Sequence, residues 1–452
     1  MLEIIILAAG EGKRMKSARP KVLQTVGGRP MLERLVDTAK ALAPDRIHVV
    51  IGAGGDQVQE ALAGLDLVWA EQRERLGTGH AAMQALPAVD PEARVLVLPG
   101  DMPLVRPSTL ARLLKSDADL TVLSFIAEDP TGYGRILRDG DAVRGIREEK
   151  DASDEERAID EVNSGVLAAG AADLAAWLER VGADNAQGEY YLTDCVELAA
   201  DDGRDVDAVI AGDAGELMGA NDRVQMAVLE RVFQQRARRS LMEQGAALAD
   251  PDSVQVRGEI DVGRDVFIDV NVVLQGRIRL GDGVQLGAGS VLVDCELAAG
   301  TVVHPYCVLE GAKTTGACSV GPFARLRPGT ELAEDVKIGN FVETKNARMS
   351  QGAKASHLAY VGDAEVGPAA NLGAGTITCN YDGVNKHRTV IGAGAFIGSN
   401  SSLVAPVEIG AEATVGAGSV ISGEAPAGQL TLSRARQRTI PDWKRPRKKN
   451  RD

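Results

Sequence analysis

The sequence predicts an α/β domain with a mainly parallel sheet, then one long helix, and then a parallel β-helix. Short apolar segments alternate with helical patterns over about the first 220 residues, and aliphatic residues recur at every sixth position from about residue 258. The composition agrees, because the 452 residues include 51 Gly but only 6 Phe, 6 Tyr and 3 Trp. Cores so poor in aromatic side chains must be filled with Ala, Val, Leu and Ile.

The overall composition argues against several classes of protein. The 50 basic and 64 acidic residues give a net charge of −14, which disfavours a general nucleic-acid binder because such proteins normally present a basic surface. The sequence lacks the Gly-x-y repeat of collagen, and it contains no apolar run that approaches the roughly 20 residues needed to span a bilayer. The 5 cysteines are odd in number and lack CxxC pairs, so we expect structural thiols in a reducing cytoplasm.

The first part of the chain reads as alternating strands and helices. The strand candidates are short apolar runs, whereas apolar residues recur at helical spacing in the helix candidates. We expect strands over residues 3–7, 46–51 and 94–98, and helices over residues 31–43 and 77–86. Residues 221–244 lack glycine and place Val224, Val228 and Val232 at helical spacing, which predicts one long amphipathic helix that connects two domains.

The second half of the chain carries a hexapeptide repeat. Three six-residue sides complete one coil of a β-helix, and one aliphatic side chain per side points into a narrow lumen. Large aromatic side chains do not fit there, and tight corners need small residues or residues with positive φ. Residues 378–389 (TCNYDGVNKHRT) interrupt the repeat and predict a loop that leaves the coil. The repeat positions are Val262, Ile268, Leu274, Leu280, Leu286 and Leu292, then Val320, Leu326, Leu332 and Ile338, and finally Ile391, Ile397, Leu403, Ile409, Val415 and Ile421.

A glycine-containing loop, LAAGEGKRM, follows the first predicted strand. It matches neither GxxxxGK[ST] nor GxGxxG, but Gly10 and Gly12 allow backbone N–H groups to approach a phosphate or a base. Arg14 and Lys21 add fixed positive charge close by. Taken alone, this pattern also fits an ordinary strand-to-helix turn. Later segments strengthen the nucleotide-site interpretation; they are Gln72, Gly77-Thr78-Gly79, Pro99-Gly100-Asp101, Gly132-Tyr133-Gly134, Glu148, Asn163 and Asn221-Asp222.

These motifs resemble those of the sugar-nucleotide pyrophosphorylases. LAAGxGxRM, PKVL, LGTGHA, GD at a strand end, TGYGRI and NSG occur in the expected order. With the hexapeptide repeat, about residues 2–446 resemble the bacterial family of bifunctional N-acetylglucosamine-1-phosphate uridyltransferases and glucosamine-1-phosphate acetyltransferases. The resemblance implies a Rossmann-like nucleotidyltransferase domain (1–222), a connector helix (223–245), a left-handed parallel β-helix acetyltransferase domain (246–433) and a basic C-terminal tail (434–452).

For the first domain, the resemblance implies attack of a sugar 1-phosphate oxygen on the α-phosphorus of UTP, with release of pyrophosphate. Asp101 and Asn221 would hold Mg²⁺, for which hard oxygen ligands are suited. Arg14 and Lys21 would supply the catalytic positive charge. The implied nucleotide and sugar site comprises Leu7, Ala8, Ala9, Gly10, Lys21, Gln72, Gly77, Thr78, Pro99, Gly100, Asp101, Gly134, Glu148, Asn163 and Asn221.

Alternatives remain open for three of these positions. Asp101 could be no more than a cap at the end of a strand. Glu149 competes with Glu148 for the place beside the sugar, because both lie in one acidic run (REEKDASDEE). Pro99 occupies a position where many relatives carry an aromatic residue, and we expect this difference to alter packing around the nucleotide rather than the metal ligand.

For the second domain, polar residues that break the hexapeptide pattern indicate a site, because stacked coils bring distant segments together. The resemblance implies that His357 is the base that deprotonates the amine of glucosamine 1-phosphate, which must be neutral to attack acetyl-CoA. The Ala374 N–H would stabilise the oxyanion. Implied binding residues are Arg327 and Lys345 for the phosphate, Tyr360, Asn371, Asn380 and Tyr381 for the sugar and acetyl group, and Ser399, Ala417 and Arg434 for coenzyme A. An alternative is a zinc site built from His304, His357 and His387.

The resemblance therefore predicts a cytoplasmic homotrimer that acetylates first and uridylylates second, producing UDP-N-acetylglucosamine, a cell-wall precursor. Its co-substrates would be acetyl-CoA and UTP, with neither a membrane nor a nucleic acid as a partner. One rival is a nucleotidyltransferase with a regulatory solenoid, as in ADP-glucose pyrophosphorylases. Another is a nonenzymatic trimeric scaffold. The basic tail fits either a solvated end or a clamp between subunits.

Overall fold

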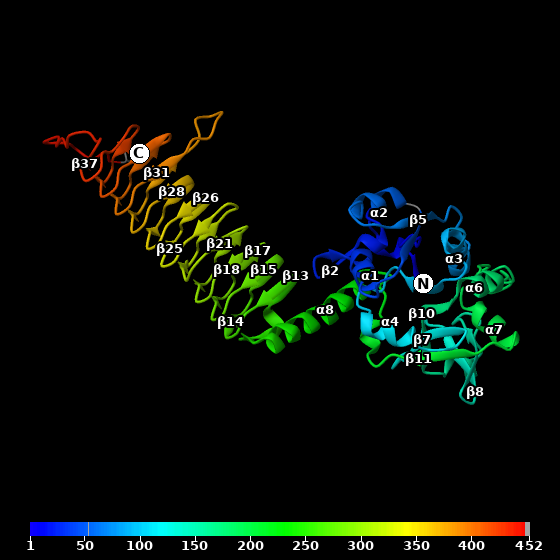
Figure 1. Ribbon diagram of the computed structural model, residues 1–452. Helices are drawn as coiled ribbons and strands as arrows, with labels where there is room; N and C mark the ends of the chain where they lie inside the picture. The colour runs from blue at the N-terminus through cyan, green and yellow to red at the C-terminus, as the bar shows by residue number, and fades with distance from the viewer. Residues whose placement is uncertain (53, 448–452) are drawn as a thin grey trace, which may run out of the picture. The chain divides into compact units, whose positions relative to one another are not determined.

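The computed structural model describes residues 1–52 and 54–447, so the last residues of the basic tail, 448–452, lie outside the described part. Two compact units divide the chain after Arg236. None of the described helices is long and apolar enough to cross a membrane. The predicted order of an α/β domain, a long helix and a β-helix is confirmed (Figure 1).

The first unit is built on a nine-stranded mixed sheet with the order β11-β7-β10-β6-β1-β4-β5, to which the β8–β9 hairpin is added. Strands β1, β4, β5 and β6 pair in parallel, whereas β10 runs antiparallel to both β6 and β7. The strands are β1 (Leu2–Leu7), β4 (Arg46–Ile51), β5 (Val68–Glu71), β6 (Arg94–Pro99), β7 (Leu120–Ile126), β8 (Arg135–Asp139), β9 (Ala142–Arg147), β10 (Glu161–Gly170) and β11 (Val206–Ile210), with the small pair β2 (Thr25–Val26) and β3 (Arg29–Pro30) apart from the sheet.

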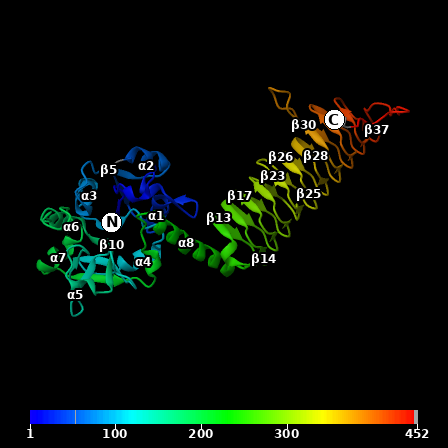
Figure 2. The ribbon, with the colours of Figure 1, turned by 180° about the vertical axis from the view of Figure 1, so that it is seen from behind.

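Helices cover both faces of this sheet because its strands alternate apolar side chains between two cores. Ile4 and Ile6 of β1 join one core with α1, α2 and α4, while Ile5 joins the other core with α3, α6 and α7. Figures 1 and 2 show the same two groups of helices on opposite sides of the sheet. The helices are α1 (Met31–Lys40), α2 (Gly55–Ala61), α3 (Thr78–Ala85), α4 (Pro107–Leu113), α5 (Asp154–Arg157), α6 (Ala171–Leu178), α7 (Asp194–Asp201) and α8 (Arg223–Gln244).

Helix α8 begins in the first unit and ends in the second. Its N-terminal half is fastened to the first unit by Met226 and Leu229, which are buried in a small core that includes Met31 of α1. Phe233 continues this contact, since the guanidinium of Arg34 lies 4.2 Å from the centre of its ring. The C-terminal half contributes to the core of the second unit. The boundary between the two units thus falls inside the helix.

The second unit is a solenoid of stacked parallel strands (Figure 2). Most strands pair with partners 17 or 18 residues away, as in Leu274↔Leu292 and Leu292↔Leu309, whereas pairs that span the projecting loop are 25 residues apart, as in Asn371↔Phe396. One sheet contains β12 (Ala246–Leu248), β14 (Val266–Ile268), β16 (Gln285–Leu286), β19 (Val302–Val303), β22 (Ser319–Val320), β25 (Lys337–Asn340), β27 (Lys354–His357), β29 (Asn371–Leu372), β32 (Phe396–Ile397), β35 (Thr414–Val415) and β37 (Leu430–Thr431).

The other sheet of the solenoid folds around a corner and supplies two faces, because its longest strands pair on both sides of a bend. It contains β13 (Gln255–Val262), β15 (Val273–Leu280), β17 (Val291–Val293), β18 (Glu296–Leu297), β20 (Val308–Glu310), β21 (Lys313–Thr314), β23 (Arg325–Leu326), β24 (Glu331–Leu332), β26 (Glu343–Met349), β28 (Tyr360–Val366), β30 (Ile377–Cys379), β31 (Thr389–Ile391), β33 (Ser402–Val404), β34 (Val407–Ile409) and β36 (Val420–Ile421). Three faces therefore enclose one lumen.

The predicted repeat positions fill this lumen. All of them are buried except Val262, which is partly buried in the first coil. Between the predicted series the lumen also holds Thr314, Thr344 and Thr378, each with its hydroxyl hydrogen-bonded. The hexapeptide pattern shifts its phase in the sequence because some sides contain five residues, as between Leu292 and Leu297. Threonine at a lumen position does not shift the phase, but it hides the aliphatic signal in some coils.

The aromatic side chains of the solenoid lie outside the lumen, as their size requires. Tyr306, Phe323 and Phe341 occupy one corner on three successive coils and stack with ring centres 5.3 and 5.4 Å apart. All three have positive φ. The predicted excursion is also present: the chain leaves the coil after Cys379 and returns at Thr389, and this orange segment projects from the solenoid in Figure 1.

Candidate functional sites

A cavity of about 410 Å³ opens at the carboxyl edge of the sheet in the first unit. Strands β1, β4 and β6 end together there, because Leu7 lies opposite both Val50 and Pro99. Gly100 allows the close approach of these ends, since a Cβ on it would lie 2.8 Å from the carbonyl oxygen of Leu7. The predicted residues that line the cavity are Leu7, Ala9, Gly10, Lys21, Gln72, Gly77, Thr78, Pro99, Asp101, Glu148 and Asn163.

Three polar side chains meet at one end of this cavity. The Lys21 ammonium donates to Asp101 Oδ2 at 2.5 Å and to Asn221 Oδ1 at 2.7 Å. Gly219 leaves room for this arrangement, because a Cβ there would lie 3.0 Å from Asp101 Oδ2. Asp101 and Asn221 are 120 residues apart in sequence, yet both direct an oxygen at a single cationic position. The structure therefore brings together both predicted metal ligands and one predicted phosphate-binding cation.

The predicted nucleotide-binding turn lies at the start of α3. Gln72 is buried, and its amide donates to the carbonyl oxygen of Gly77 at 3.0 Å. Gly77 has φ of 108° and lies against Tyr190, where a Cβ would be 2.5 Å from the carbonyl oxygen. The Thr78 hydroxyl accepts from the Leu192 N–H at 3.0 Å. This turn is thus anchored to residues 190–192, not to the β8–β9 hairpin.

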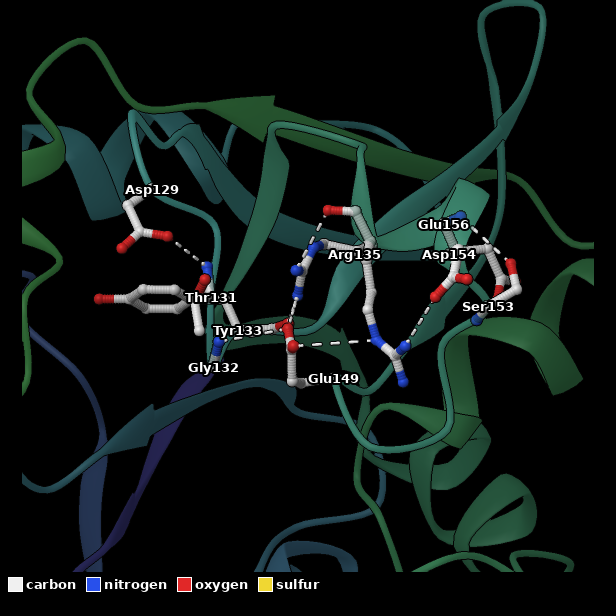
Figure 3. A network of polar contacts seen from close by, with 10 residues as sticks. Asp129, Thr131, Gly132, Tyr133, Arg135, Glu149, Ser153, Asp154 and Glu156 are labelled. Carbon is white, nitrogen blue, oxygen red and sulfur yellow. Dashed lines mark hydrogen bonds and ion pairs between the residues drawn. The ribbon is translucent and has the colours of Figure 1, made fainter.

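Adjacent glutamates after β9 have opposite environments. Glu148 lines the cavity, accepts from the Thr193 hydroxyl at 2.9 Å, and has its pKa raised mainly by burial. Glu149 points away and pairs with Arg135 at 2.6 Å, and this hydrogen bond lowers its pKa (Figure 3). The chain turns directly after β9, where the Asp151 N–H donates to the Glu148 carbonyl oxygen at 3.0 Å, and the two side chains leave this turn in different directions. Of the two sequence alternatives, Glu148 is the one that faces the cavity.

Some predicted residues lie outside the lining of the cavity. Arg14 is exposed on a short 3₁₀ helix (Lys13–Met15), while Ala8, Gly100 and Gly134 are buried beside the cavity. Asn221 is partly buried and also lies outside the lining, although its side chain contacts Lys21, which is part of it. Sequence reasoning missed Arg75 and Thr193, which do line it. Arg75 pairs with Glu11 of the glycine-containing loop, and no motif in the sequence indicates that these two segments meet.

In the second unit, five predicted or neighbouring residues occupy one position on successive coils. Asn340 is in register with His357, and continuing the registers of β27, β29 and β32 places Ala374, Ser399 and Ala417 in the same row. Backbone hydrogen bonds confirm this stacking, because the N–H groups of residues 400 and 418 donate to the carbonyl oxygens of Ala374 and Ser399. The Arg434 guanidinium donates to the Ala417 carbonyl at 2.9 Å.

His357 has a defined tautomer in this row. Its Nδ1 lies 2.6 Å from Asn340 Oδ1. An amide oxygen only accepts hydrogen bonds, so this contact assigns Nδ1 as the donor and leaves Nε2 as the ring nitrogen that faces away from Asn340. The His357 side chain is exposed. Asn340 was not among the residues expected from the sequence, because it lies on the preceding coil, 17 residues away.

A second row carries the positive charge of the solenoid site. Arg327 and Lys345 are in register on successive coils, and Arg327 pairs with Glu343 at 3.0 Å. The pKa of Lys345 is lowered by Lys386, a neighbour from the projecting loop that sequence reasoning did not identify. Lys345 is followed by a corner, and His357 precedes one. The two rows therefore lie at opposite edges of one face of the solenoid, not in one groove of the single chain.

The remaining predicted residues surround these rows. Tyr360 and Asn371 are half-buried on the coil, whereas Tyr381 is exposed in the projecting loop. Asn380 starts that loop and donates to the carboxylate of Asp363. Burial alone would raise the pKa of Asp363, but the hydrogen bonds that Asp363 accepts from Asn346 and Asn380, together with the nearby lysines, lower this pKa overall.

The zinc alternative receives no support from the geometry. Within residues 1–52 and 54–447, no three His, Cys, Asp or Glu side chains are placed to hold a metal ion. His304, His357 and His387 instead have separate partners, which are Ser319, Asn340 and Asp382.

Comparison with known proteins identifies both units. Residues 4–185 match the MobA-like NTP transferase domain, and residues 388–423 match the bacterial transferase hexapeptide (six repeats). The chain is 54% identical over 451 residues to the bifunctional protein GlmU of Stenotrophomonas maltophilia (strain K279a), covering 99% of both chains. It is 56% identical over 450 residues to the GlmU of Xanthomonas euvesicatoria pv. vesicatoria, again with 99% of both covered. The chain therefore belongs to the GlmU family of bifunctional enzymes, in which a nucleotidyltransferase domain precedes a hexapeptide-repeat acetyltransferase domain.

Proposed function

We propose that the first unit transfers a uridylyl group from UTP to N-acetylglucosamine 1-phosphate, after the second unit has acetylated glucosamine 1-phosphate with acetyl-CoA. The product would be UDP-N-acetylglucosamine, a precursor for cell-wall synthesis. The observation that carries the first reaction is the convergence of Asp101 and Asn221 on Lys21, because Lys21 and Asp101 line a cavity that also includes Gln72, Gly77 and Thr78. Such a site combines a phosphate-binding charge with a base-binding pocket.

Asp101 and Asn221 fit a Mg²⁺ ion, because both are hard oxygen donors aimed at one position. The bound ion would neutralise phosphate charge, and two protein ligands leave places for phosphate oxygens and water. The Lys21 ammonium would then bind the phosphates of UTP instead of these two oxygens. Arg14, on the exposed loop, would also bind the phosphates. These residues align the sugar phosphate oxygen with the α-phosphorus, and pyrophosphate leaves on the opposite side.

Glu148, Gly134 and Asn163 would hold the sugar and its acetamido group. Glu148 and Asn163 line the cavity, and the Asn163 N–H donates to the carbonyl oxygen of Gly134 at 2.8 Å. Gln72, Gly77 and Thr78 would contact the uracil. The two substrates thus approach from different walls of one cavity.

In the second unit, His357 Nε2 would accept a proton from the amine of glucosamine 1-phosphate. The amine nitrogen then forms a bond to the thioester carbonyl carbon, and the C–S bond to coenzyme A breaks, releasing its thiol after protonation. Ala374 N–H would stabilise the intervening oxyanion. Ala374, Ser399, Ala417 and Arg434 continue the His357 row and would bind coenzyme A along the corner.

We further propose a homotrimer, because the two rows of predicted residues lie at opposite edges of one face. A neighbouring solenoid would bring the Arg327 and Lys345 row of one chain opposite the His357 row of another. The free thiols of all five cysteines agree with a reducing cytoplasm. The net charge of −14 agrees with small-molecule partners instead of nucleic acid.

An assay with the full chain tests these proposals. We expect pyrophosphate release from UTP to require N-acetylglucosamine 1-phosphate, and coenzyme A release to require glucosamine 1-phosphate. With glucosamine 1-phosphate, UTP should yield pyrophosphate only when acetyl-CoA is also present. Direct uridylylation of glucosamine 1-phosphate at an equal rate would contradict the proposed order. Sedimentation should give three times the mass of one chain, and a monomer that acetylates at full rate would contradict the shared site.

A further inference from the structure

The most deeply buried cation of the first unit has no part in the chemistry described above. Arg135 begins strand β8 and is 1% exposed. Its guanidinium pairs with Glu149 Oε2 at 2.6 Å, and among the described residues its Nε has no hydrogen-bond partner (Figure 3). Burying a charge is costly unless it is paired, so such a residue needs either a structural or a functional explanation.

The pair lies directly behind one wall of the cavity. Strands β8 and β9 are antiparallel with Arg135 opposite Arg147, so the register continues with Gly134 opposite Glu148. A Cβ on Gly134 would lie 3.4 Å from Glu148 Oε1, which places both residues on the cavity side. Arg135 and Glu149 come next along each segment and point to the other side. Glu148, which lines the cavity, and Gly134, which is buried beside it, are therefore each followed in sequence by one member of the ion pair.

The same pair also holds the turn that precedes β8. Glu149 Oε2 accepts from the Gly132 N–H at 3.2 Å, and the Arg135 guanidinium donates to the carbonyl oxygen of Tyr133. On the opposite edge, the Asn163 N–H binds the Gly134 carbonyl. The turn of residues 132–134 is thus fastened on one edge by the Arg135–Glu149 pair and on the other by β10.

We propose that Arg135 and Glu149 are positioning residues for the acceptor sugar phosphate. The ion pair holds Gly134 and Glu148 in the positions from which they would bind the acetamido sugar, and it does not itself contact the sugar. This inference rests on the proposed function of the cavity. The nucleotide turn packs on residues 190–192, and Thr193 of the same segment holds Glu148, whereas the Arg135–Glu149 pair contacts Gly132, Tyr133 and Arg157. Loss of the pair should therefore weaken binding of the sugar phosphate much more than binding of UTP.

Steady-state kinetics of the full chain test this separation. Glu149→Gln removes the charge but retains an oxygen that can accept from Gly132. We expect KM for N-acetylglucosamine 1-phosphate to rise about tenfold, the usual scale for a supporting partner, and KM for UTP to change less than about twofold. Glu149→Asp retains the carboxylate on a shorter stem and should recover part of the loss.

A matched control lies at the other end of the same hairpin. Asp139 pairs with Arg144 at 3.3 Å on the exposed tip of β8–β9. Asp139→Asn also removes one carboxylate charge from an ion pair and should leave both KM values unchanged. If it raised KM for the sugar phosphate as much as Glu149→Gln does, any loosening of the hairpin would account for the effect and the proposal would be wrong.

Other outcomes also decide the proposal. A Glu149→Gln enzyme with the wild-type KM for the sugar phosphate would overturn it, as would equal increases in both KM values. Should Glu149→Gln lose its cooperative thermal transition, Glu149→Asp decides alone, because only the positioning role predicts a selective KM effect. Failure of the proposed function is distinguishable, since the wild-type enzyme itself would then not use N-acetylglucosamine 1-phosphate.

Discussion

The two units assemble their sites in different ways. In the first unit, strand ends, a turn before α3 and a hairpin enclose one cavity, so a single chain brings residues from Leu7 to Thr193 together. In the second unit, the coil repeat places residues in straight rows at the edges of an open face. An α/β sheet concentrates side chains where its strands end, whereas a solenoid spaces them evenly. The residues of the first site converge on one cavity, whereas those of the second lie along two separate edges of one face.

The exposure of the charged residues reflects this difference. The Lys21 and Asp101 side chains are 12% and 21% exposed, whereas the paired Arg327 and Glu343 side chains are 35% and 36% exposed. Partly buried charges interact more strongly than charges in contact with water. Loss of a charge should therefore lower activity more in the first unit than at the exposed charged row of the second. Because the two sites belong to different units, each variant should affect one of the two reactions.

The largest effect is expected for the base of the solenoid site. His357→Ala removes the acceptor for the amine proton and should lower acetyl transfer about a thousandfold, within the range typical of general bases. Pyrophosphate release from UTP and N-acetylglucosamine 1-phosphate should remain unchanged, which a coupled spectrophotometric assay measures. His304→Ala is the control, since His304 contacts Ser319 away from this row. Normal acetyl transfer by His357→Ala would refute the assignment of the base.

A reciprocal loss is expected in the first unit. Asp101→Ala removes one of two oxygens that converge on Lys21 and should lower uridylyl transfer about a hundredfold or more at ordinary Mg²⁺ concentration. Acetyl transfer should not change, because the two sites belong to separate units. Asp119→Ala serves as the control, since Asp119 pairs with Arg204 outside the cavity lining. If both carboxylates proved equally dispensable, Asp101 would be only a strand-end cap.

A smaller effect is expected where one residue acts through another. Asn340→Ala removes the oxygen that orients His357 Nδ1–H and should lower kcat for acetyl transfer about tenfold. Asn340→Asp keeps an oxygen acceptor at this position and should retain more activity than the alanine variant. If both variants were equally impaired, orientation of the imidazole would not explain the loss.

The smallest effect concerns stability, and it separates the two adjacent glutamates. Burial raises the pKa of Glu148, so the folded state disfavours its charge; this cost is present at neutral pH and disappears as pH falls below the carboxyl pKa. Glu148→Gln should therefore raise Tm slightly at pH 7 but not near pH 4. The pKa of Glu149 is lowered by Arg135, so Glu149→Gln should lower Tm at pH 7. Thermal melts of both variants at the two pH values measure this contrast, and shifts of the same sign would contradict it.

Local patterns in the sequence were sufficient for much of the fold. The strand over residues 46–51 has the predicted bounds, and most of the predicted lumen positions are buried. The pattern failed where lumen positions are occupied by Thr314, Thr344 and Thr378, because a buried hydroxyl with a hydrogen-bond partner is as acceptable there as an aliphatic group. The helix expected over residues 31–43 ends at Lys40, and Ala43 has a positive φ that ends helical geometry.

The candidate sites were less accessible to sequence reasoning. Motifs indicated Asp101, Glu148 and His357, but not Arg75, Asn340 or Lys386, which meet them or their neighbours only in three dimensions. The choice between Glu148 and Glu149 was also undecidable from an acidic run, since both have the same chemistry. It depended on the direction in which each carboxylate leaves the turn that follows β9.

Both architectures are predictable from local patterns, because periodic burial of apolar side chains is a local property of strand, helix and coil. It also indicated the chemistry of both units through short motifs. Which polar groups converge depends on the three-dimensional fold, since Asp101 and Asn221 both contact Lys21 from distant segments and Asn340 meets His357 through coil stacking. Contacts between distant segments depend on the register and the direction of side chains, and no local pattern encodes either.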